Sequence, residues 1–231
     1  MKTIGLIGGT TWYSTVEYYR LINETVNKRH GDNTSAKILL YSVNFGEIEF
    51  LTERQDWDAI AEILTDAAKR LEMAGADCLL LCANTMHLNA ARVQEAINIP
   101  LIHIADVTVK VIKEQKLAGV LLLGTRYTMM ADFYPELLDK EGIKLFIPGA
   151  EDRDWINSTI YNELGKGVIL EETQKKYLHI IQKFIPDGVQ GVILGCTEIP
   201  LLIKPGDCSL PLFNTTYLHA TAAVDFALND R

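Results

Sequence analysis

Short apolar runs alternate along the chain with longer stretches in which apolar and polar residues mix. Runs that are apolar throughout are typical of parallel strands buried on both faces. The stretches between them predict helices, most clearly at Ser14–Arg29, Asp56–Ala74 and Glu171–Phe184. This alternation predicts an α/β fold with parallel sheets and right-handed crossovers. The expected strands are Ile4–Ile7, Ala36–Val43, Cys78–Cys82, Leu101–Ile104, Gly119–Leu123, Ile143–Phe146 and Gly191–Leu194.

The first expected helix carries a start signal. Ser14 and Glu17 have the spacing of a capping box, and apolar residues follow at Tyr18, Leu21 and Ile22. We therefore expect this helix to begin at Ser14.

Two features recur in the two halves of the chain. Their separation is nearly equal, with 75 residues from Gly8 to Ala83 and 72 residues from Gly124 to Cys196. This repetition predicts a duplicated α/β unit, although any two α/β halves share strand-then-turn patterns. Ligands collect at the carboxyl ends of parallel strands, so four polar strand ends would converge on one cleft if the halves face each other. The matching segments are Gly5–Thr10 with Val120–Thr125, and Ala76–Thr85 with Val189–Glu198.

Composition narrows the function classes. Hydrophobic residues make up 48% and charged residues 23% of the 231 residues, so the chain can bury a core without disulfides or metals. The net charge of −8 argues against a nucleic-acid-binding face and against an anionic membrane surface. We expect neither a signal peptide nor a membrane span, because no basic segment leads into an apolar run and no apolar stretch reaches about 18 residues. The four cysteines fit neither a disulfide scaffold nor a zinc module, so the expected compartment is a reducing cytoplasm.

Cys196 follows a strand in the fourth quarter of the chain and precedes Thr197 and Glu198. One interpretation makes it a reactive thiol, whose pKa backbone N–H groups of the next helix would lower. The other makes it a buried core cysteine, which is the commoner fate of a lone cysteine. Position alone leaves both open, and the repeat favours the first.

The matching segment of the first half places Asn84 and Thr85 directly after an apolar strand. They could bind a ligand carboxylate or cap the next helix. The repeat pairs Ala83 with Cys196 and Cys82 with Gly195. We expect Cys82 to face the core, because successive strand residues point to opposite faces.

The remaining motifs are weaker. The Gly8–Thr11 turn could cradle an anion with backbone N–H groups, but it matches neither a dinucleotide nor a nucleoside triphosphate motif. Cys78, Cys82 and His87 could be mistaken for metal ligands, but their spacing along an apolar strand predicts no metal site. The lysines show no signature of a pyridoxal Schiff base.

A cleft with polar groups on two faces suits one chemistry in particular. Inverting the α-carbon of an amino acid requires a base on one face and an acid on the other. Thiols suit both roles, because an unperturbed cysteine titrates near pH ~8.5. Acid–base catalysis contributes only ~10²–10⁴-fold, so stabilisation of the carbanion must supply much of the rest.

Several segments, spread over most of the chain, are distinctive together. On these segments the chain resembles the cofactor-independent aspartate/glutamate racemase family. The segments are Ile4–Thr10 with Trp12, Ser14 and Thr15, then Tyr18–Asn23, Ser42–Glu49, Cys82–His87, His103–Asp106, Gly124–Thr128 and Gly195–Glu198.

The resemblance implies two flavodoxin-like domains with parallel sheets, related by pseudo-two-fold symmetry, and an active site in the cleft between them. It also implies a small amino-acid substrate, a homodimer and no cofactor. The chain would return to its first domain near the C-terminus, so that residues 1–105 and 210–231 form the first domain and 106–209 the second.

Carried over position by position, the resemblance makes Cys196 an acid/base, with Thr197 and Glu198 beside the substrate. Asn84 and Thr85 would bind the α-carboxylate. The other positions implied to lie near the substrate are Thr10, where many relatives have Met, Thr52 and Glu163.

Ala83 departs from the family pattern, which has an acid/base, usually Cys and sometimes Thr, immediately before Asn-Thr. A methyl group cannot transfer a proton, so we expect racemisation to be strongly impaired. Three explanations stay open: a deliberate substitution, a natural single-thiol enzyme similar to arylmalonate decarboxylases, or replacement by Cys82 through a bulge, which would reverse its direction. The first two are favoured.

Three functions remain in competition: a racemase of aspartate or glutamate, a related decarboxylase or maleate-type isomerase, and a catalytically silent amino-acid-binding protein. A dicarboxylic substrate would require a second clamp for its side chain. Arg54, Arg126 and Lys166 are candidates for it, although exposed basic residues are usually only solvated surface.

Overall fold

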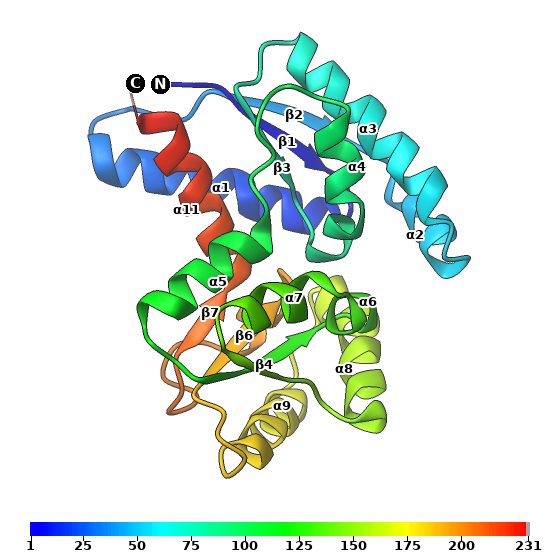
Figure 1. Cartoon of the computed structure of the whole chain (residues 1–231), viewed down its shortest axis with the longest axis vertical. Helices are drawn as coiled ribbons and strands as arrows, with labels where there is room; N and C mark the ends of the chain where they lie inside the picture. Colours follow the sequence, from blue (N-terminus) through cyan, green and yellow to red (C-terminus); the bar gives the residue numbers. More distant parts are fainter. Residues whose placement is uncertain (230–231) are drawn as a thin grey trace. The chain divides into compact units, whose positions relative to one another are not determined.

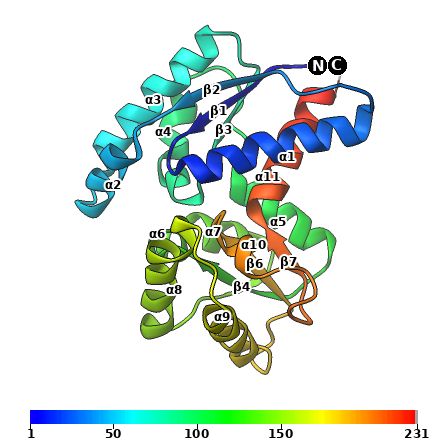
Figure 2. The ribbon, with the colours of Figure 1, turned by 180° about the vertical axis from the view of Figure 1, so that it is seen from behind.

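The computed structural model of the protein describes residues 1–229 and contains two parallel sheets. Contacts divide the chain into two units, each with one sheet (Figures 1 and 2). The first unit comprises Met1–Ile104 and the C-terminal segment from Tyr217, and the second comprises Ala105–Thr216. The resemblance implied a return near position 210, and the contacts place it at Tyr217.

The sheet of the first unit has the order β2-β1-β3 and is parallel throughout. The strands are β1 (Ile4–Gly8), β2 (Ile38–Ser42) and β3 (Cys78–Leu81). The helices are α1 (Trp12–His30), α2 (Phe45–Glu53), α3 (Trp57–Met73), the 3₁₀ helix η1 (Asn84–Asn89), α4 (Ala90–Glu95) and, from the chain's end, α11 (Thr215–Leu228).

Helices cover both faces of this sheet, as both views show (Figures 1 and 2). On one face, Leu6 and Leu80 pack with residues of α1 and α11. On the other face, Leu79 and Leu81 pack with residues of α3 and α4. The strands are therefore apolar in every position that the helices cover, which explains their uninterrupted apolar runs.

Helix α11 completes the core of the first unit from the far end of the chain. Its buried apolar side chains are small, which lets the helix lie close to the sheet and to α1. They are Ala220, Ala223, Val224 and Ala227, and all are fully buried.

The sheet of the second unit has the order β5-β4-β6-β7, again parallel. Its strands are β4 (Gly119–Gly124), β5 (Lys144–Phe146), β6 (Gly191–Gly195) and β7 (Leu212–Asn214). Its helices are α5 (Ile104–Glu114), α6 (Arg126–Met130), α7 (Phe133–Lys140), α8 (Ala150–Asn162), η2 (Leu164–Lys166), α9 (Glu171–Phe184) and α10 (Ile199–Leu202).

The two sheets repeat one topology. In each, the first strand in sequence lies between the second and the third, and an added parallel partner flanks the third. That partner is β7 in the second sheet and a single bridge, Leu79 with Leu101, in the first. The registers agree with Gly8 as the counterpart of Gly124, because Ile7 pairs with Leu81 as Leu123 pairs with Leu194. The match of Gly5–Thr10 with Val120–Thr125 is therefore one residue out of register. Cys196 and Ala83 thus follow their strands at equivalent positions.

Some expected elements differ from the structure. The strand expected at Leu101–Ile104 is reduced to the bridge at Leu101, because α5 already begins at Ile104. Strand β7 was not expected. Helix α1 begins at Trp12 rather than Ser14, because Thr11 is the cap and its hydroxyl accepts a hydrogen bond from the Ser14 N–H at 3.2 Å. Within residues 1–229, no helix combines the length and apolar character that crossing a bilayer requires.

Candidate active site

The turn after β1 places a polar segment at the carboxyl end of the first sheet. Gly9 has a φ of +84°, and a Cβ there would lie 2.2 Å from the Val43 carbonyl oxygen, so the position requires glycine. The Gly9 N–H donates to Thr15 Oγ1 at 2.8 Å and is therefore used within the turn instead of facing a ligand. Thr10 is buried, and its Oγ1 has no hydrogen-bond partner among residues 1–229. Thr10 is thus the polar group of this turn that could serve a ligand.

The alternation of faces in β3 continues through Cys82 and Ala83. Cys82 is fully buried in the core beneath α1 and α11, whereas Ala83 packs against the core on the opposite face. The Cys82 backbone is held on both sides, since its N–H donates to the Ile7 carbonyl at 3.0 Å and its carbonyl accepts from Ser14 Oγ at 3.0 Å. Burial raises the pKa of the Cys82 thiol. Cys82 therefore faces the core as expected, and no bulge turns it toward the polar strand end.

Asn84 and Thr85 open η1 directly after this strand end, and both are buried. Thr52, the third polar candidate of the first unit, is buried in α2. Its hydroxyl donates to the Ile48 carbonyl at 2.7 Å, so the Thr52 donor is used within its own helix.

Cys196 follows β6 in the second unit and is half-buried. Its thiol donates to Oε2 of Glu198 at 2.8 Å, and the Thr197 hydroxyl donates to the same oxygen at 2.8 Å. Glu198 itself is buried. One buried carboxylate oxygen thus accepts two hydrogen bonds from its immediate neighbours.

Burial and the adjacent Glu198 carboxylate raise the pKa of the Cys196 thiol well above its ordinary value. The backbone N–H groups of Thr197 and Glu198 act in the opposite direction but are outweighed. The expectation that these N–H groups would leave Cys196 with a lowered pKa is therefore wrong. A negative charge on sulfur is opposed by the negative charge already present beside it.

Glu163 lies at the end of α8 and accepts a hydrogen bond from Thr173 Oγ1 at 2.6 Å. Glu163 and Cys196 both affect the pKa of one buried tyrosine, Tyr177. The Tyr177 hydroxyl lies 3.0 Å from Thr159 Oγ1, and its pKa is raised by burial and further by Cys196, Glu163 and Glu198. The second unit thus brings Cys196, Thr197 and Glu198 together through hydrogen bonds, whereas Glu163 is linked to them only by its effect on Tyr177.

Tyr177 and Ser14 were not predicted as parts of the site's framework. Tyr177 is one apolar position on an amphipathic helix, and no sequence signal distinguishes it from core. Ser14 had a signal, but its spacing to Glu17 suggested a helix cap. Among residues 1–229, no three His, Cys, Asp or Glu side chains are grouped so as to hold a metal ion.

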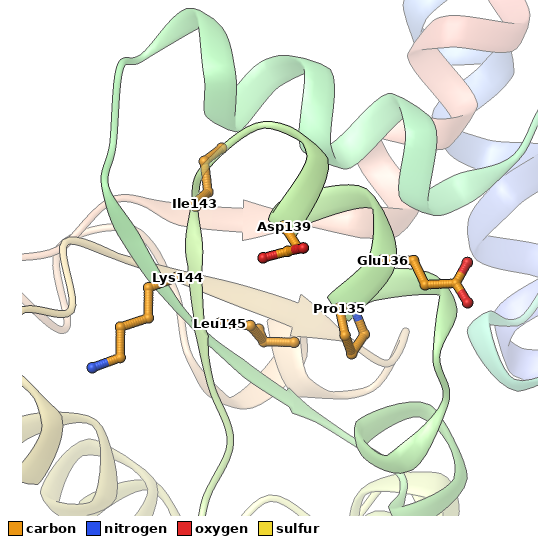
Figure 3. Close-up of a pocket in the computed structure, with 6 residues that line it drawn as sticks. All are labelled: Pro135, Glu136, Asp139, Ile143, Lys144 and Leu145. Carbon is orange, nitrogen blue, oxygen red and sulfur yellow. The ribbon is translucent and has the colours of Figure 1, made fainter.

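A shallow depression of ≈ 450 Å³ lies on the second unit beside α7 and β5. It contains none of the predicted site residues and lies at the amino end of β5, opposite to the strand ends that carry Cys196. Glu136 and Lys144 point away from each other around it (Figure 3). Since no polar groups converge there, we do not regard it as the site. Its lining is Pro135, Glu136, Asp139, Ile143, Lys144 and Leu145.

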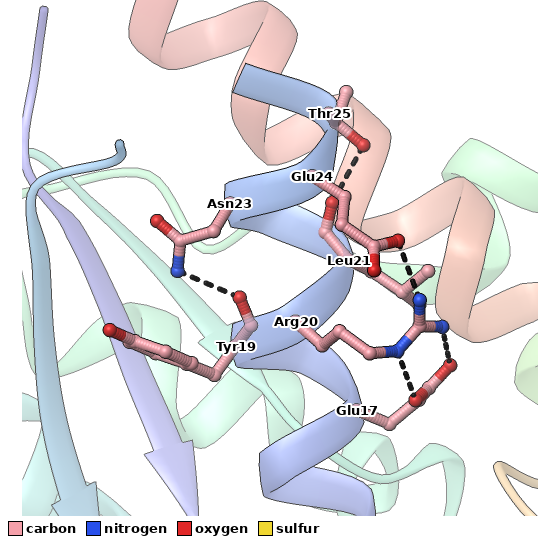
Figure 4. Close-up of polar contacts among 7 residues, drawn as sticks. All are labelled: Glu17, Tyr19, Arg20, Leu21, Asn23, Glu24 and Thr25. Carbon is pink, nitrogen blue, oxygen red and sulfur yellow. Dashed lines mark hydrogen bonds and ion pairs between the residues drawn. The ribbon is translucent and has the colours of Figure 1, made fainter. Parts of the chain in front are cut away.

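The basic residues near these segments differ in the contacts that their side chains make. Arg20 on α1 is held by Glu17 and Glu24, with N–O distances of 2.5 Å to each, so it is not a clamp for a ligand (Figure 4). The guanidinium of Arg54 lies over the Phe50 ring at 3.5 Å. Arg126 and Lys166 are exposed, and neither they nor Arg54 form an ion pair within the described chain.

Comparisons with known proteins agree on one family. A family model described as Asp/Glu/Hydantoin racemase matches residues 7–223. The broad specificity amino-acid racemase RacX of Bacillus subtilis is 28% identical over 225 residues, which cover 96% of each chain. A crystal structure of a candidate Asp/Glu racemase from Yersinia pestis is 48% identical, with a TM-score of 0.93 over 99% of this chain and 100% of that one. An aspartate racemase homologue from Pyrococcus horikoshii is 37% identical, with a TM-score of 0.88 over the same shares.

Proposed function

Because the chain belongs to the Asp/Glu/Hydantoin racemase family, we propose that it moves the α-proton of aspartate or glutamate as an amino-acid racemase whose first acid/base is missing. The observation that carries the proposal is the pair formed by Cys196 and buried Glu198 at the end of β6. Ala83 stands at the equivalent position of the first sheet.

Cys196 is the proposed acid/base, and Glu198 is proposed to take its proton. When the thiol proton passes to Glu198 Oε2, the thiolate can accept the α-proton of the substrate, and the electron pair of the C–H bond stays on the α-carbon. The reverse transfer returns a proton from the Cys196 thiol to the same face. The Thr197 hydroxyl donates to the same Glu198 oxygen and therefore shares this acceptor with the thiol.

Asn84, Thr85 and Thr10 are proposed to bind the substrate's carboxylates, since hydroxyl and amide groups are suitable donors. No cofactor is required, because the substrate's own carboxylate and these donors can stabilise the carbanion. Inversion additionally requires a proton donor on the opposite face of the α-carbon, and the methyl group of Ala83 cannot supply one. We therefore expect the chain to exchange the α-proton of one enantiomer with retention and to racemise very slowly.

The test is solvent exchange in D₂O with the separate L- and D-enantiomers of aspartate and glutamate. The chain as it stands should incorporate deuterium into one enantiomer without inverting it. The Ala83→Cys variant should exchange both enantiomers and interconvert them, with racemisation faster by ~10²–10⁴-fold, the usual contribution of one acid–base group.

Ala83→Val is the matched control, because it adds side-chain volume at this position without a group that can transfer a proton. Equal exchange before and after the Ala83→Cys change would contradict the racemase proposal. Binding of an amino acid with no exchange in either form would instead support a silent binding protein.

A single-thiol carbanion enzyme is the second candidate. It is favoured by the burial of Cys82, which leaves Cys196 as the thiol at the predicted site. Release of carbon dioxide from a 2-substituted malonate, abolished by Cys196→Ala, would identify this activity.

A further inference from the structure

Three histidines from distant parts of the sequence meet inside the first unit. The ring centroid of His87 lies 4.7 Å from that of His103 and 5.4 Å from that of His219. His87 and His219 are buried. The Tyr18 hydroxyl joins the cluster through Nδ1 of His219 at 2.8 Å. None of these side chains has a role in the proton transfer proposed above.

The hydrogen bonds of His87 fix its tautomer. Its Nδ1 lies 3.0 Å from the carbonyl oxygen of Ala83, so Nδ1 carries the proton and donates it. Its Nε2 accepts a hydrogen bond from the N–H of Ile104 at 3.2 Å. Burial and the neighbouring imidazoles of His103 and His219 lower the pKa of His87 well below its ordinary value, which keeps the ring neutral.

His87 therefore holds the backbone of the residue that occupies the acid/base position. The preceding carbonyl, that of Cys82, is held by Ser14 Oγ at 3.0 Å. The Ala83 carbonyl also accepts the longer bond of 3.3 Å from the Met86 N–H, which η1 makes by itself. Since the carbonyls on both sides of the Ala83 Cα are held, the direction of its Cα–Cβ bond is set as well.

We propose that His87 is a positioning residue, which aims the side chain at position 83 by holding its carbonyl group and linking it to Ile104. This inference rests on the proposed function, because position 83 matters only where an acid/base is needed there. His219 holds the backbone two residues before Ile104, since its Nε2 donates to the Ile102 carbonyl at 2.7 Å.

Two substitutions of His87 separate its two hydrogen bonds. The side-chain nitrogen of asparagine can occupy the place of Nδ1, so His87→Asn can still donate to the Ala83 carbonyl. Glutamine reaches further, so His87→Gln can keep the acceptor for Ile104 but loses the bond to Ala83. Both variants are made in an Ala83→Cys background, where position 83 carries a thiol.

The first readout does not require catalysis. Alkylation of the thiol at position 83 and of Cys196 is followed by peptide mass spectrometry in the same sample. We expect His87→Gln to change the rate at position 83 by ~10-fold or more and His87→Asn to change it by about threefold or less, because a small misplacement of a held group has large kinetic effects. The rate at Cys196 should stay within about twofold in both variants.

The second readout is deuterium exchange into the two enantiomers. His87→Gln should slow by ~10–10²-fold the exchange that depends on position 83, through kcat and not KM, while retained exchange through Cys196 continues. A purely structural role would lower both exchanges together, because both would follow the folded fraction.

Equal alkylation and exchange rates in His87→Asn and His87→Gln would overturn the inference. So would an equal fall in the rates at position 83 and at Cys196. If the Ala83→Cys background exchanges no amino acid, the proposed function fails, and the alkylation rates still decide whether His87 positions this residue.

Discussion

At the scale of single residues, Cys196 and Glu198 compete for one proton. Their atoms lie 2.8 Å apart, and the carboxylate is buried, so its charge is poorly screened by water. The carboxylate raises the pKa of the thiol and at the same time offers it a nearby acceptor. The protonation of the Cys196 thiol thus depends on Glu198 as well as on the backbone N–H groups after the strand.

Replacing Glu198 tests this pairing directly. Glu198→Gln removes the negative charge that opposes the thiolate, so the pKa of Cys196 should fall. Alkylation of Cys196 by iodoacetamide at pH 7 should accelerate by about tenfold or more, because one pKa unit changes the thiolate fraction tenfold. The measurement is the pH dependence of the alkylation rate.

The half-buried Cys208 provides the internal reference in the same sample, because its thiol interacts with the Leu210 carbonyl instead of a carboxylate. A slower reaction of Cys196 in Glu198→Gln, with Cys208 unchanged, would contradict the expected fall in the Cys196 pKa and would show that proton acceptance by Glu198 outweighs the effect of its charge.

The sequence could identify Cys196 and its polar neighbours but not their electrostatics. Thr197 and Glu198 were expected near the substrate from the motif. Their hydrogen bonds to one oxygen depend on side-chain rotamers and on the burial of Glu198 by distant residues. The same limit applies to His87, whose partners Ala83 and Ile104 become adjacent only in the folded unit.

At the scale of elements, the β1–α1 turn depends on a single backbone conformation. Gly9→Ala should destabilise the protein, because its φ of +84° is strained for any residue with a Cβ and the new atom would lie 2.2 Å from the Val43 carbonyl. We expect a loss of about 3 kcal/mol or more in the free energy of unfolding by urea, since the strain alone costs ~1–2 kcal/mol.

Gly75→Ala is the matched control for this prediction. Gly75 belongs to the same unit and has a φ of +94°, but a Cβ there would meet nothing within 4 Å. It should lose only the strain cost of ~1–2 kcal/mol. Equal losses in the two variants would mean that the contact with Val43 is relieved without cost.

The sequence predicts long elements better than short ones. The helix expected at Glu171–Phe184 has the same bounds in the structure, because its amphipathic period is unbroken over 14 residues. Strand β7 has only 3 residues and was missed, since so short a segment shows no period. Leu101 was expected to open a strand, but the pairing stops after the single bridge with Leu79 because α5 begins at Ile104.

At the scale of the whole molecule, the buried histidines make stability depend on pH. Burial lowers the pKa of His219 to about 3, whereas a histidine in the unfolded chain titrates near ~6.5. Between these values the unfolded chain binds a proton that the folded chain does not. Stability should therefore fall as the pH drops through this window, by up to ~1.4 kcal/mol per pH unit for His219 alone.

The measurement is the free energy of urea unfolding between pH 7 and pH 4.5. His219→Gln should be less stable at pH 7 but should show a shallower decline, by up to ~1.4 kcal/mol per unit. His30→Gln, at the exposed end of α1, provides the reference for replacing an exposed histidine in the same measurement. The same slope for the protein and for His219→Gln would contradict this prediction.

The duplicated α/β architecture was visible in the sequence because each half repeats a strand-and-turn pattern at a similar spacing. The sheet registers support the pairing of Ala83 with Cys196 when Gly8, and not Gly9, is taken as the counterpart of Gly124. The exact place where the chain returns to its first unit was not visible, because α11 is a continuous helix from Thr215 and carries no break at Tyr217.

The return of α11 to the first core has a consequence for biosynthesis. The ribosome synthesises residues 105–216 before Tyr217, so all strands of the second unit are made first. At that point the core of the first unit still lacks Ala220, Ala223 and Val224. Domains made from continuous segments usually mature from the N-terminus onward. In this nascent chain we expect the order to be reversed, because the half that is translated first keeps one face of its sheet incompletely covered until α11 has been synthesised.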